Sequence, residues 1–409
     1  MSYRMNCIWF RGIPLLLATL LHSSLAGVAN ASQPFLEKTN IFEAGQAGVA
    51  LYRIPGIVVT TNGTVLVYCE ARKNSKSDWA DSDTYLRRST NGGLSWQPAR
   101  KIAHFGERLP RSPIALAKKE GSADDQTVNN PMAIVDRQTG DIHFLYCVNY
   151  ERCFYLSSRD DGKTFSQPLD ITLTFDKFRP DYDCHVIATG PGHGIQLASG
   201  RLLVPVWLST GANGHSPSVA ATIYSDDHGH TWQRGDIAAV TSDQWSSPNE
   251  NSVVQLADGS VMMNFRATAA SHRRVFTTSP DGTTRWAKPR FDDALLEPIC
   301  MASLTRLTAQ PASAKNRLLF ANPDSLTEIK NVGKPGSHFD RRNLSIKLSY
   351  DEGKSWAVNK VLEPGGSAYS DMAVLADGTI LCFYERKHFL TVARFNLEWL
   401  TDGKDSIAN

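Results

Sequence analysis

Charged and reactive side chains recur at matching positions of a repeated strand–turn–strand unit in this chain of 409 residues. In an antiparallel hairpin, the start of the first strand and the end of the second lie at the same end. Guanidinium groups there could bind an acidic ligand, while carboxyl and phenol groups could hold or transfer protons. A single strand-end charge is more often a solvated surface group, but recurrence in several units indicates one shared site. The residues are Arg53, Glu70 and Arg72 at the first unit, Glu250 and Arg266 at the fourth, Arg341 after the fifth, and Tyr369, Glu385 and Arg386 at the sixth.

The unit that positions these side chains is an apolar strand, a short turn and a second apolar strand. Turn dipeptides such as Asn-Gly and Asp-Gly between β-rich runs predict hairpins. The fifth copy has a longer polar connection than the others. The predicted strand pairs are 54–60 with 64–69, 131–135 with 142–148, 194–197 with 202–207, 252–256 with 261–265, 302–307 with 318–320, and 372–375 with 379–384.

A second motif, Ser-x-Asp-x-Gly-x-Ser/Thr-aromatic, follows these hairpins. The carboxylate is expected to accept local backbone N–H groups, and the glycine to take a positive φ. Recurrence at roughly 55 to 70 residues indicates a repeat architecture. The copies lie at 89–96 (with Asn91 in place of Asp), 158–165, 225–232 and 349–356, with a degenerate copy at 279–286.

These two motifs together predict an all-β fold: a six-bladed β-propeller with Asp-box turns, as a single domain over residues 32–409. Residues 35–43 form a spare strand, and the last repeat lacks an Asp-box turn. We therefore expect this strand to complete the last blade and close the ring. A β-sandwich is the alternative, but it does not explain six equivalent units. Helical sequence is scarce, with a short helix expected around 111–119.

Residues 1–31 have the layout of a secretory signal peptide. Arg4 and Arg11 precede an apolar run at 13–21, and Ala29 and Ala31 form a small-x-small cleavage site. The run is shorter than the ~20 residues that span a bilayer. We therefore expect export to a periplasmic, extracellular or lysosome-type compartment, with no stable membrane insertion.

The charge balance gives no indication of a polyanionic partner. The predicted leader contains two of the 43 basic residues and none of the 41 acidic residues. The mature chain would be close to neutral, so neither nucleic acid nor an anionic membrane surface is expected as a partner.

Six cysteines lie beyond the leader. Cys69 and Cys382 stand in apolar strands, as small buried hydrophobes do. Cys147 and Cys153 could form a disulfide in an oxidising compartment, but spacing does not decide it. The chain has no Cys-x-x-Cys or His-x-x-x-His pair, so we expect no structural zinc and no cofactor.

With several Asp-box turns present, the sequence Tyr-Arg-Ile-Pro at 52–55 resembles the signature of the exo-α-sialidase (neuraminidase) family. The resemblance runs from about residue 41 to residue 395. It implies an arginine triad that clamps the substrate carboxylate, a nucleophile with its activating base, and an acid/base. The implied residues are Arg53, Arg266 and Arg341 for the triad, Tyr369 for the nucleophile, Glu250 for its base and Asp78 for the acid/base.

Some of these assignments have neighbouring alternatives. Asp81 and Asp83 share the loop of Asp78, and Arg342 adjoins Arg341, which fits the family pattern Arg-x-Asn-Leu at 341–344. Arg72 is expected to contact the substrate carboxylate or Asp78, with a surface ion pair as the alternative. The pocket for an N-acetyl group should come from blades two and three. Its candidates are 129–131, Tyr150 and 185–193.

The chemistry of sialic acid suits this set of side chains. Its anomeric carbon bears a carboxylate, which guanidinium groups bind bidentately. A carboxylate nucleophile would be repelled there, whereas a neutral phenol is not; sialidases are a known tyrosine exception to the two-carboxylate pattern. Because a phenol has a pKa near ~10, it needs a base within hydrogen-bond reach.

The resemblance implies hydrolysis of terminal α-linked sialic acids from glycoproteins, glycolipids and oligosaccharides, with retention and without a metal. Two other kinds of function stay open. One is a propeller lectin that binds sialic acid without cleaving it, although such a lectin would be expected to lack Tyr369, Glu250 or Asp78. The other is a trans-sialidase, or an enzyme for a related nine-carbon acid. The sequence does not indicate linkage preference or oligomeric state.

Overall fold

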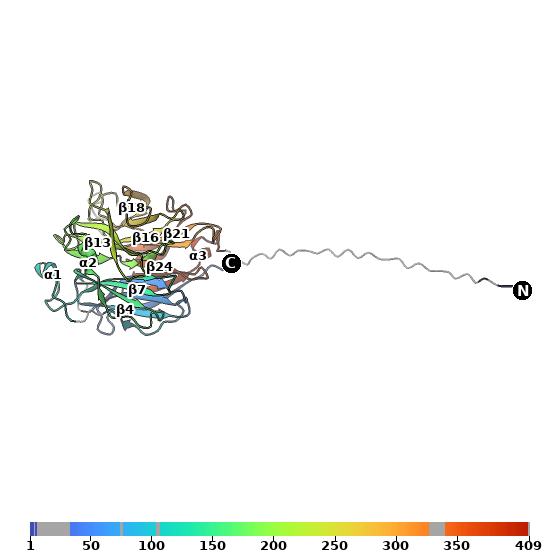
Figure 1. Cartoon of the computed structure of the whole chain (residues 1–409), viewed down its shortest axis with the longest axis horizontal. Helices are drawn as coiled ribbons and strands as arrows, with labels where there is room; N and C mark the ends of the chain where they lie inside the picture. The colour runs from blue at the N-terminus through green and yellow to red at the C-terminus, as the bar shows by residue number, and fades with distance from the viewer. Residues whose placement is uncertain (4, 6–32, 74–76, 104–106, 327–339, 408–409) are drawn as a thin grey trace.

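The fold is described by a computed structural model, which covers residues 1–3, 5, 33–73, 77–103, 107–326 and 340–407. The predicted leader at 1–31 lies almost wholly outside the described residues. The protein is all-β, with 46% strand and 4% helix. Its described part forms six sheets arranged as the blades of a propeller, as the sequence predicts. In Figure 1 the strands of blades one and two lie along one side of the body, and those of blade four lie opposite.

Each blade is an antiparallel sheet that begins with a predicted hairpin. Blade one contains β2 (Leu51–Val59), β3 (Val65–Arg72), β4 (Ser82–Ser89) and β5 (Arg100–Lys101); blade two contains β6 (Val128–Val135), β7 (Ile142–Val148), β8 (Arg152–Ser158) and β9 (Leu169–Asp170). Blade three contains β10 (Val186–Thr189), β12 (Ile195–Gln196), β13 (Leu202–Ser209), β14 (Ser218–Ser225) and β15 (Gln233–Ala239). Blade four contains β16 (Asn251–Gln255), β17 (Val261–Phe265), β18 (Arg273–Ser279) and β19 (Arg290–Leu296); blade five contains β20 (Ser303–Thr308), β21 (Arg317–Pro323), β22 (Arg342–Ser349) and β23 (Val358–Gly366).

Blade six closes the ring. It contains β24 (Ser370–Val374), β25 (Ile380–Arg386), β26 (Phe389–Phe395) and, from the other end of the chain, β1 (Leu36–Glu43). β1 pairs with β26 in antiparallel register, from Leu36 opposite Phe395 to Glu43 opposite Phe389. The prediction that the N-terminal strand joins the last blade is confirmed.

The inner strand of blade three differs from the prediction of one strand at 194–197. It is split into β10 and β12, and between them β11 (Gly192–His193) pairs in parallel with β6 of blade two. Gly190, Pro191 and Gly192 separate the pieces. Proline donates no backbone N–H, and both glycines have positive φ, which interrupts an antiparallel ladder.

Apolar side chains fill the space between neighbouring blades. β3, β7 and β13 are buried along their whole length, because each blade packs against a neighbour on both faces. Their sequences are therefore nearly continuous apolar runs rather than alternating ones. Met132 and Val204 belong to the cluster between blades two and three, and Val67 and Phe383 to that between blades one and six. Burial contributes about 1.5–3 kcal/mol for each large side chain, which holds the inner strands and their end residues in place.

The Asp-box turns have the geometry that the sequence predicts. In the copy at 349–356, the Asp351 carboxylate accepts the N–H of Ser355 at 2.8 Å, and Gly353 has a φ of 78°. Asn91 does the same in the first copy, where its Oδ1 accepts the N–H of Ser95 at 2.9 Å. These turns follow the third strand of blades one to five, at the end opposite the strand ends that carry the candidate site residues.

The residue after the Asp in these turns connects neighbouring blades, which the motif itself did not reveal. In three copies this residue has a positive φ and its side chain reaches the hairpin turn of the preceding blade. The pairs are Asp161 with Thr60 (2.5 Å), His228 with Asp136 (2.6 Å) and Glu352 with the N–H of Ala257 (2.9 Å).

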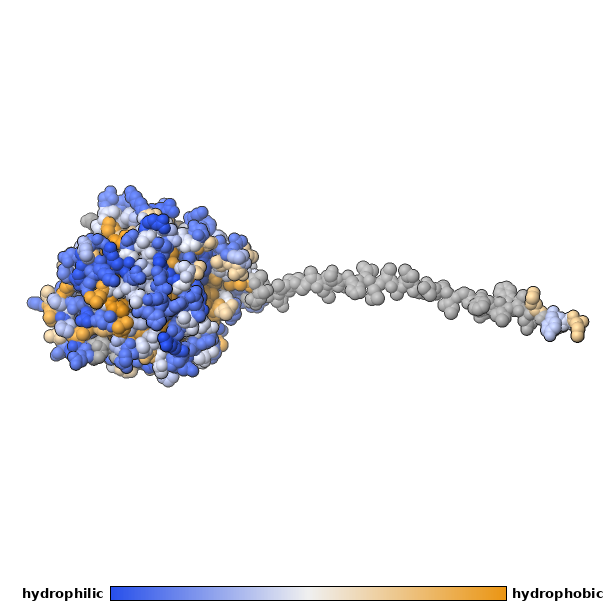
Figure 2. All heavy atoms as spheres, in the orientation of Figure 1, coloured by the Kyte–Doolittle hydropathy of each residue, from blue (hydrophilic) through white to orange (hydrophobic). Residues whose placement is uncertain are grey.

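The remaining elements are short. α1 (Pro113–Ala117) lies within the predicted helical segment, while α2 (Thr172–Asp176) and α3 (Leu397–Leu400) were not predicted. α1 and α3 lie toward opposite edges of the body in Figure 1. The six cysteines are buried and unpaired, although Cys147 stands directly opposite Cys153. The surface in Figure 2 is mostly hydrophilic, with apolar residues in separate patches. In the described part of the chain, no helix has the length and apolar character to cross a membrane.

Candidate active site

The predicted site residues come from different blades and meet at one mouth of the propeller. Each stands at or next to the end of an inner hairpin, apart from Asp78 on the β3–β4 loop and Arg341 on the approach to β22. Arg53 lies in β2, Arg72 ends β3, Glu250 directly precedes β16, Arg266 directly follows β17, Arg341 directly precedes β22 and Tyr369 directly precedes β24.

Tyr369 lies at the centre of this group, with 4% of its surface exposed. Its hydroxyl donates to Oε1 of Glu250 at 2.5 Å and accepts from Nη1 of Arg266 at 3.0 Å. The same Arg266 nitrogen donates to Oε2 of Glu250 at 2.5 Å. Phenol, carboxylate and guanidinium therefore form a closed hydrogen-bonded triangle.

The electrostatics of the triangle keep the phenol protonated. Burial, and after it the Glu250 carboxylate, raises the pKa of Tyr369 well above its ordinary value, while the nearby arginines act in the opposite direction. The phenolic proton is thus held on a short hydrogen bond to a carboxylate oxygen. That is the arrangement in which a base can remove the proton as the phenol attacks.

The other two arginines contact the ring of Tyr369. The guanidinium carbon of Arg53 stands 4.8 Å from the ring centroid and that of Arg341 stands 5.2 Å from it, which are cation–π distances. All three guanidinium groups therefore lie around one phenol. Arg342, the neighbouring alternative, instead donates to Asp340 at 2.8 Å, so the geometry favours Arg341.

Two of these arginines are oriented by fixed acceptors. Arg53 donates from Nε and Nη2 to the two oxygens of Glu385 at 3.0 and 3.2 Å. Arg341 donates from Nη2 to the carbonyl of Ile299 at 2.6 Å. A guanidinium held in this way loses little side-chain entropy when an anion binds.

Asp78 contacts two cations at the edge of the mouth. Its carboxylate lies 2.8 Å from Arg72 and 3.6 Å from Arg53, and 46% of its side chain is exposed. Burial alone would raise the pKa of Asp78, but Arg72 and Arg53 outweigh it and hold that pKa well below its usual range. The alternatives Asp81 and Asp83 both pair with Lys73 at 3.2 Å. Asp78 is therefore the acid of this loop that contacts the arginines of the site.

Arg72 is buried, with 1% of its side chain exposed, and also pairs with Glu70 at 2.9 Å. The alternative of a surface ion pair for Arg72 is therefore wrong. Glu70 in turn accepts the backbone N–H of Asn130 at 2.8 Å, which connects blade one to blade two beneath the site.

The proteins to which this chain is similar are consistent with the geometry of this site. A family model described as BNR repeat-like domain matches residues 111–382, which is most of the chain. The chain belongs to the exo-α-sialidase family. It is similar to a sialidase of Micromonospora viridifaciens, with 30% identity over 92% of this chain and 56% of that protein, and to an exo-alpha-sialidase of Aspergillus fumigatus, with 26% identity over 92% of this chain and 90% of that protein. Among solved structures, the Hadza microbial sialidase Hz136 matches with a TM-score of 0.70 and 26% identity over 89% of this chain and 69% of that one.

Not all of these relatives have the same extent. The chain spans only 56% and 61% of the length of the sialidases of Micromonospora viridifaciens and Bacteroides fragilis. An intramolecular trans-sialidase of Ruminococcus gnavus has the same fold, with a TM-score of 0.70, at 18% identity.

This sialidase-family site also contains residues that the sequence reasoning gave no role. Glu385, noticed only as a strand-end charge, accepts hydrogen bonds from Arg53 and from the N–H groups of Ile54 and Tyr369, at 3.0 and 3.4 Å. It therefore connects the arginine of one blade with the tyrosine of another.

An aromatic cluster beside Asp78 was also missed, apart from Tyr150. Trp79 packs on Tyr150 and stacks on His215, with ring centroids 4.7 and 5.2 Å apart, and Trp207 packs on both Tyr150 and His215. The Trp207 indole N–H and Nε2 of His215 have no hydrogen-bond partner among the described residues. These rings come from three separate loops and one strand, so no local motif signals them. His193, in the candidate segment 185–193, lies elsewhere, on the wall of a different cavity.

Two β-branched residues that contact site residues have a backbone that such residues rarely adopt. Ile54 has a φ of 60° and Ile299 a φ of 54°. Ile54 packs with Tyr369 and Cys300 in one buried cluster, and Ile299 presents its carbonyl to Arg341. Strain of this kind persists where the surrounding structure enforces it. Among the described residues, no group of three or more His, Cys, Asp or Glu side chains could hold a metal ion.

Proposed function

We propose that this protein is an exo-α-sialidase that releases terminal sialic acid from glycoconjugates by double displacement at Tyr369. One observation carries the proposal: a buried phenol donates a 2.5 Å hydrogen bond to a carboxylate while three guanidinium groups surround it. Relatives named sialidase and exo-alpha-sialidase, similar over most of this chain, support the same activity.

In the first step, Arg53, Arg266 and Arg341 bind the carboxylate on the anomeric carbon and fix the sugar over Tyr369. The phenolic oxygen attacks the anomeric carbon while Glu250 accepts the phenolic proton. The bond from the anomeric carbon to the glycosidic oxygen breaks, and Asp78 protonates that oxygen as it leaves. The product of this step is a sugar joined covalently to Tyr369.

In the second step, Asp78, now a carboxylate, removes a proton from a water molecule. The water oxygen attacks the anomeric carbon, the bond to the Tyr369 oxygen breaks, and Glu250 returns the proton to the phenol. Two inversions give net retention of configuration.

The low pKa of Asp78 in the ligand-free protein is compatible with its role as an acid. Arg53 and Arg72 stabilise its ionised form. A bound sugar carboxylate would bring a negative charge to Arg53 and offset part of that field, which favours protonation of Asp78. Substrate binding would thereby prepare the acid for the first step.

The aromatic cluster beside Asp78 is our candidate for the wall that contacts the substituents of the sugar. The unpartnered N–H of Trp207 and Nε2 of His215 could bond its polar groups. The choice between N-acetyl and other acids would depend on this wall.

The decisive assay is hydrolysis of a fluorogenic α-sialoside by the wild type and by Tyr369→Phe. Wild-type release of sialic acid, with the α-anomer detected first by NMR and with at least a ~10³-fold loss in the variant, would support the proposal. A wild type that binds sialic acid but releases none from pH 4 to pH 8 would favour a lectin instead. If an added galactoside acceptor speeds cleavage of the fluorogenic sialoside and itself becomes sialylated, a trans-sialidase would be favoured.

We also propose that the chain is exported and cleaved after Ala31, on the signal-peptide layout of its first residues. Expression of the full chain in a secreting host, followed by mass analysis, tests this. A mature chain that begins at Ser32 is expected; an intact leader on the recovered protein would contradict the proposal.

A further inference from the structure

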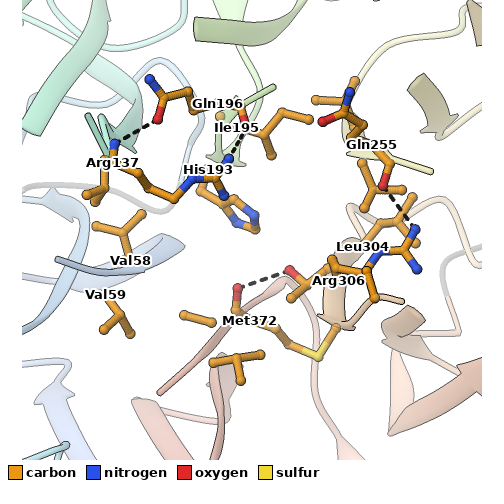
Figure 3. Close-up of a pocket in the computed structure, with 18 of the residues that line it drawn as sticks. Val58, Val59, Arg137, His193, Ile195, Gln196, Gln255, Leu304, Arg306 and Met372 are labelled. Atoms are coloured by element: carbon orange, nitrogen blue, oxygen red, sulfur yellow. Dashed lines mark hydrogen bonds between the residues drawn. The ribbon is translucent and has the colours of Figure 1, made fainter. Parts of the chain in front are cut away.

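A buried carboxylate close to Tyr369 bonds to strands of several blades, and a second cavity lies among the inner strands and their hairpin turns, at the ends remote from the candidate active site. That cavity has a volume of about 810 Å³, and inner-strand residues such as Val58, Leu304 and Met372 line it (Figure 3). His193 lies among them, with 15% of its side chain exposed. The lining does not include Tyr369, so this cavity is separate from the active site.

The buried carboxylate is Asp371, which is 1% exposed and belongs to β24 of blade six. Its Oδ2 accepts the backbone N–H of Ile57, in blade one, at 3.0 Å. Its Oδ1 accepts the hydroxyl of Ser303, in blade five, at 3.0 Å and lies 2.8 Å from Nδ1 of His193. Because β11, which carries His193, pairs with blade two, one carboxylate joins strands of four blades.

Two of the strands joined by Asp371, β24 and β2, adjoin or carry site residues. Tyr369 stands two positions before Asp371, so chain alternation directs both side chains to the same face, about 7 Å apart along the strand. Ile57 lies in β2 with Arg53. A shift of β24 against β2 would change the distance between the Tyr369 ring and the Arg53 guanidinium, now 4.8 Å.

His193 gives the buried carboxylate an ion-pair partner when its imidazole is protonated. A buried carboxylate is strongly unfavourable unless it is paired and hydrogen-bonded. Burial alone would lower the pKa of His193, but Asp371 raises it above its ordinary value. The other titratable groups near Asp371 are Tyr68 and Cys382, whose pKa values burial raises, so both are neutral.

We propose that Asp371 and His193 form an axial pair that positions Tyr369 against Arg53 and Glu250. The inference rests on the proposed function for its kinetic consequence. Asp371 is a positioning residue, because it acts on the site through β24 and the strands to which it bonds. A purely structural role would lower stability without changing the turnover of folded protein, and this difference can be measured.

The chain contains a matched control for this test. Asp136 is another fully buried carboxylate, bonded to His228 at 2.6 Å and to Gln196 at 2.7 Å, and it also joins two blades. It lies in the hairpin turn of blade two, at the end away from Tyr369. Asp371→Asn and Asp136→Asn therefore remove the same charge from similar surroundings at different distances from the site.

Turnover and binding should be measured on folded protein, well below each unfolding midpoint. For Asp371→Asn we expect kcat to fall by about 10- to 100-fold, the cost of a small misplacement of a reacting group, with the dissociation constant for sialic acid within threefold of wild type. For Asp136→Asn we expect kcat within twofold. His193→Ala should lose turnover as well, and imidazole, which can enter the second cavity, should restore part of it without affecting Asp136→Asn.

A second readout does not depend on the reaction. Wild type and both variants are labelled with 3-fluorotyrosine, and the Tyr369 signal is assigned by its absence in Tyr369→Phe. We expect Asp371→Asn, but not Asp136→Asn, to shift or broaden that signal. An unchanged signal and unchanged kcat in Asp371→Asn, or equal effects in both variants, would overturn the inference. If the wild type is inactive but the signal responds only to Asp371→Asn, the proposed function fails and the positioning role stands.

Discussion

Replacement of Arg341 by lysine tests whether the three guanidinium groups form one carboxylate site. Arg341 donates from Nη2 to the Ile299 carbonyl at 2.6 Å and faces the Tyr369 ring at 5.2 Å. The carbonyl fixes the plane of the guanidinium beside the Tyr369 ring. Lysine keeps the charge, but its single ammonium cannot serve the carbonyl and a bidentate carboxylate in the same geometry.

The expected loss follows from the bonds removed. One charge-assisted hydrogen bond is worth about 1.5–3 kcal/mol, and each 1.4 kcal/mol is about tenfold in affinity. Arg341→Lys should therefore weaken binding of sialic acid by about 10- to 150-fold. The fold should be little affected, because the site lies at the surface end of the blades.

Isothermal titration with sialic acid measures this loss, and the adjacent residue supplies the control. Arg342 has the same charge and is the next residue in the chain, but it pairs with Asp340. Arg342→Lys should change the affinity by less than about threefold, because lysine keeps the positive charge beside Asp340 and Arg342 is not one of the three arginines around Tyr369. Equal losses in both variants, or no loss in Arg341→Lys, would refute the assignment of Arg341 to the carboxylate site.

Three further outcomes are expected. Because Arg72 and Arg53 depress the pKa of Asp78, the stability that its carboxylate adds is present above the unfolded pKa of about 3.9 and is lost as the pH falls below it. In urea unfolding, the difference in unfolding free energy between wild type and Asp78→Asn should therefore shrink below about pH 4. A difference that stays constant with pH would argue against the ion pairs. Asp351→Asn should lower the free energy of unfolding by under ~0.5 kcal/mol, because Asn91 forms the same turn in the first Asp box. Asp351→Ala should lower it by about 1–2 kcal/mol. Equal losses in the two variants would contradict this account of the turn. The six buried cysteines should react with a thiol reagent only after unfolding, when all six should be counted; rapid labelling of the native protein, or four thiols instead of six, would contradict the described state.

Much of the fold could be predicted because its signals are local. Turn dipeptides marked the hairpins, and the Asp box marked the opposite turns, where Asn91 replaces the carboxylate without loss of the backbone bond. The inner strand of blade three escaped because β11 leaves its own blade to pair with β6, a tertiary contact that no local pattern encodes. The inter-blade contacts of Asp161 and His228 escaped for the same reason, since their partners lie in another repeat.

The candidate site divides in the same way. Arg53 and Tyr369 lie at strand ends of a repeat and inside recognisable motifs, so their convergence followed once the repeat was understood. Glu385 was visible as a strand-end charge, but its contact with Arg53 depends on blades six and one meeting at ring closure. Trp79 and His215 meet from separate loops and carry no motif. Spatial neighbours that are distant in sequence need a structure, or covariation among relatives, to be found.

The pairing of β1 with β26 places Leu36 opposite Phe395, at the end of blade six away from Tyr369. Both ends of the folded body therefore emerge on the side remote from the arginines. A bead, a partner protein or a cell surface attached through either end would leave the arginine-lined mouth pointing outward. A protein attached to a support near Leu36 or Phe395 would therefore keep this mouth accessible to large glycans.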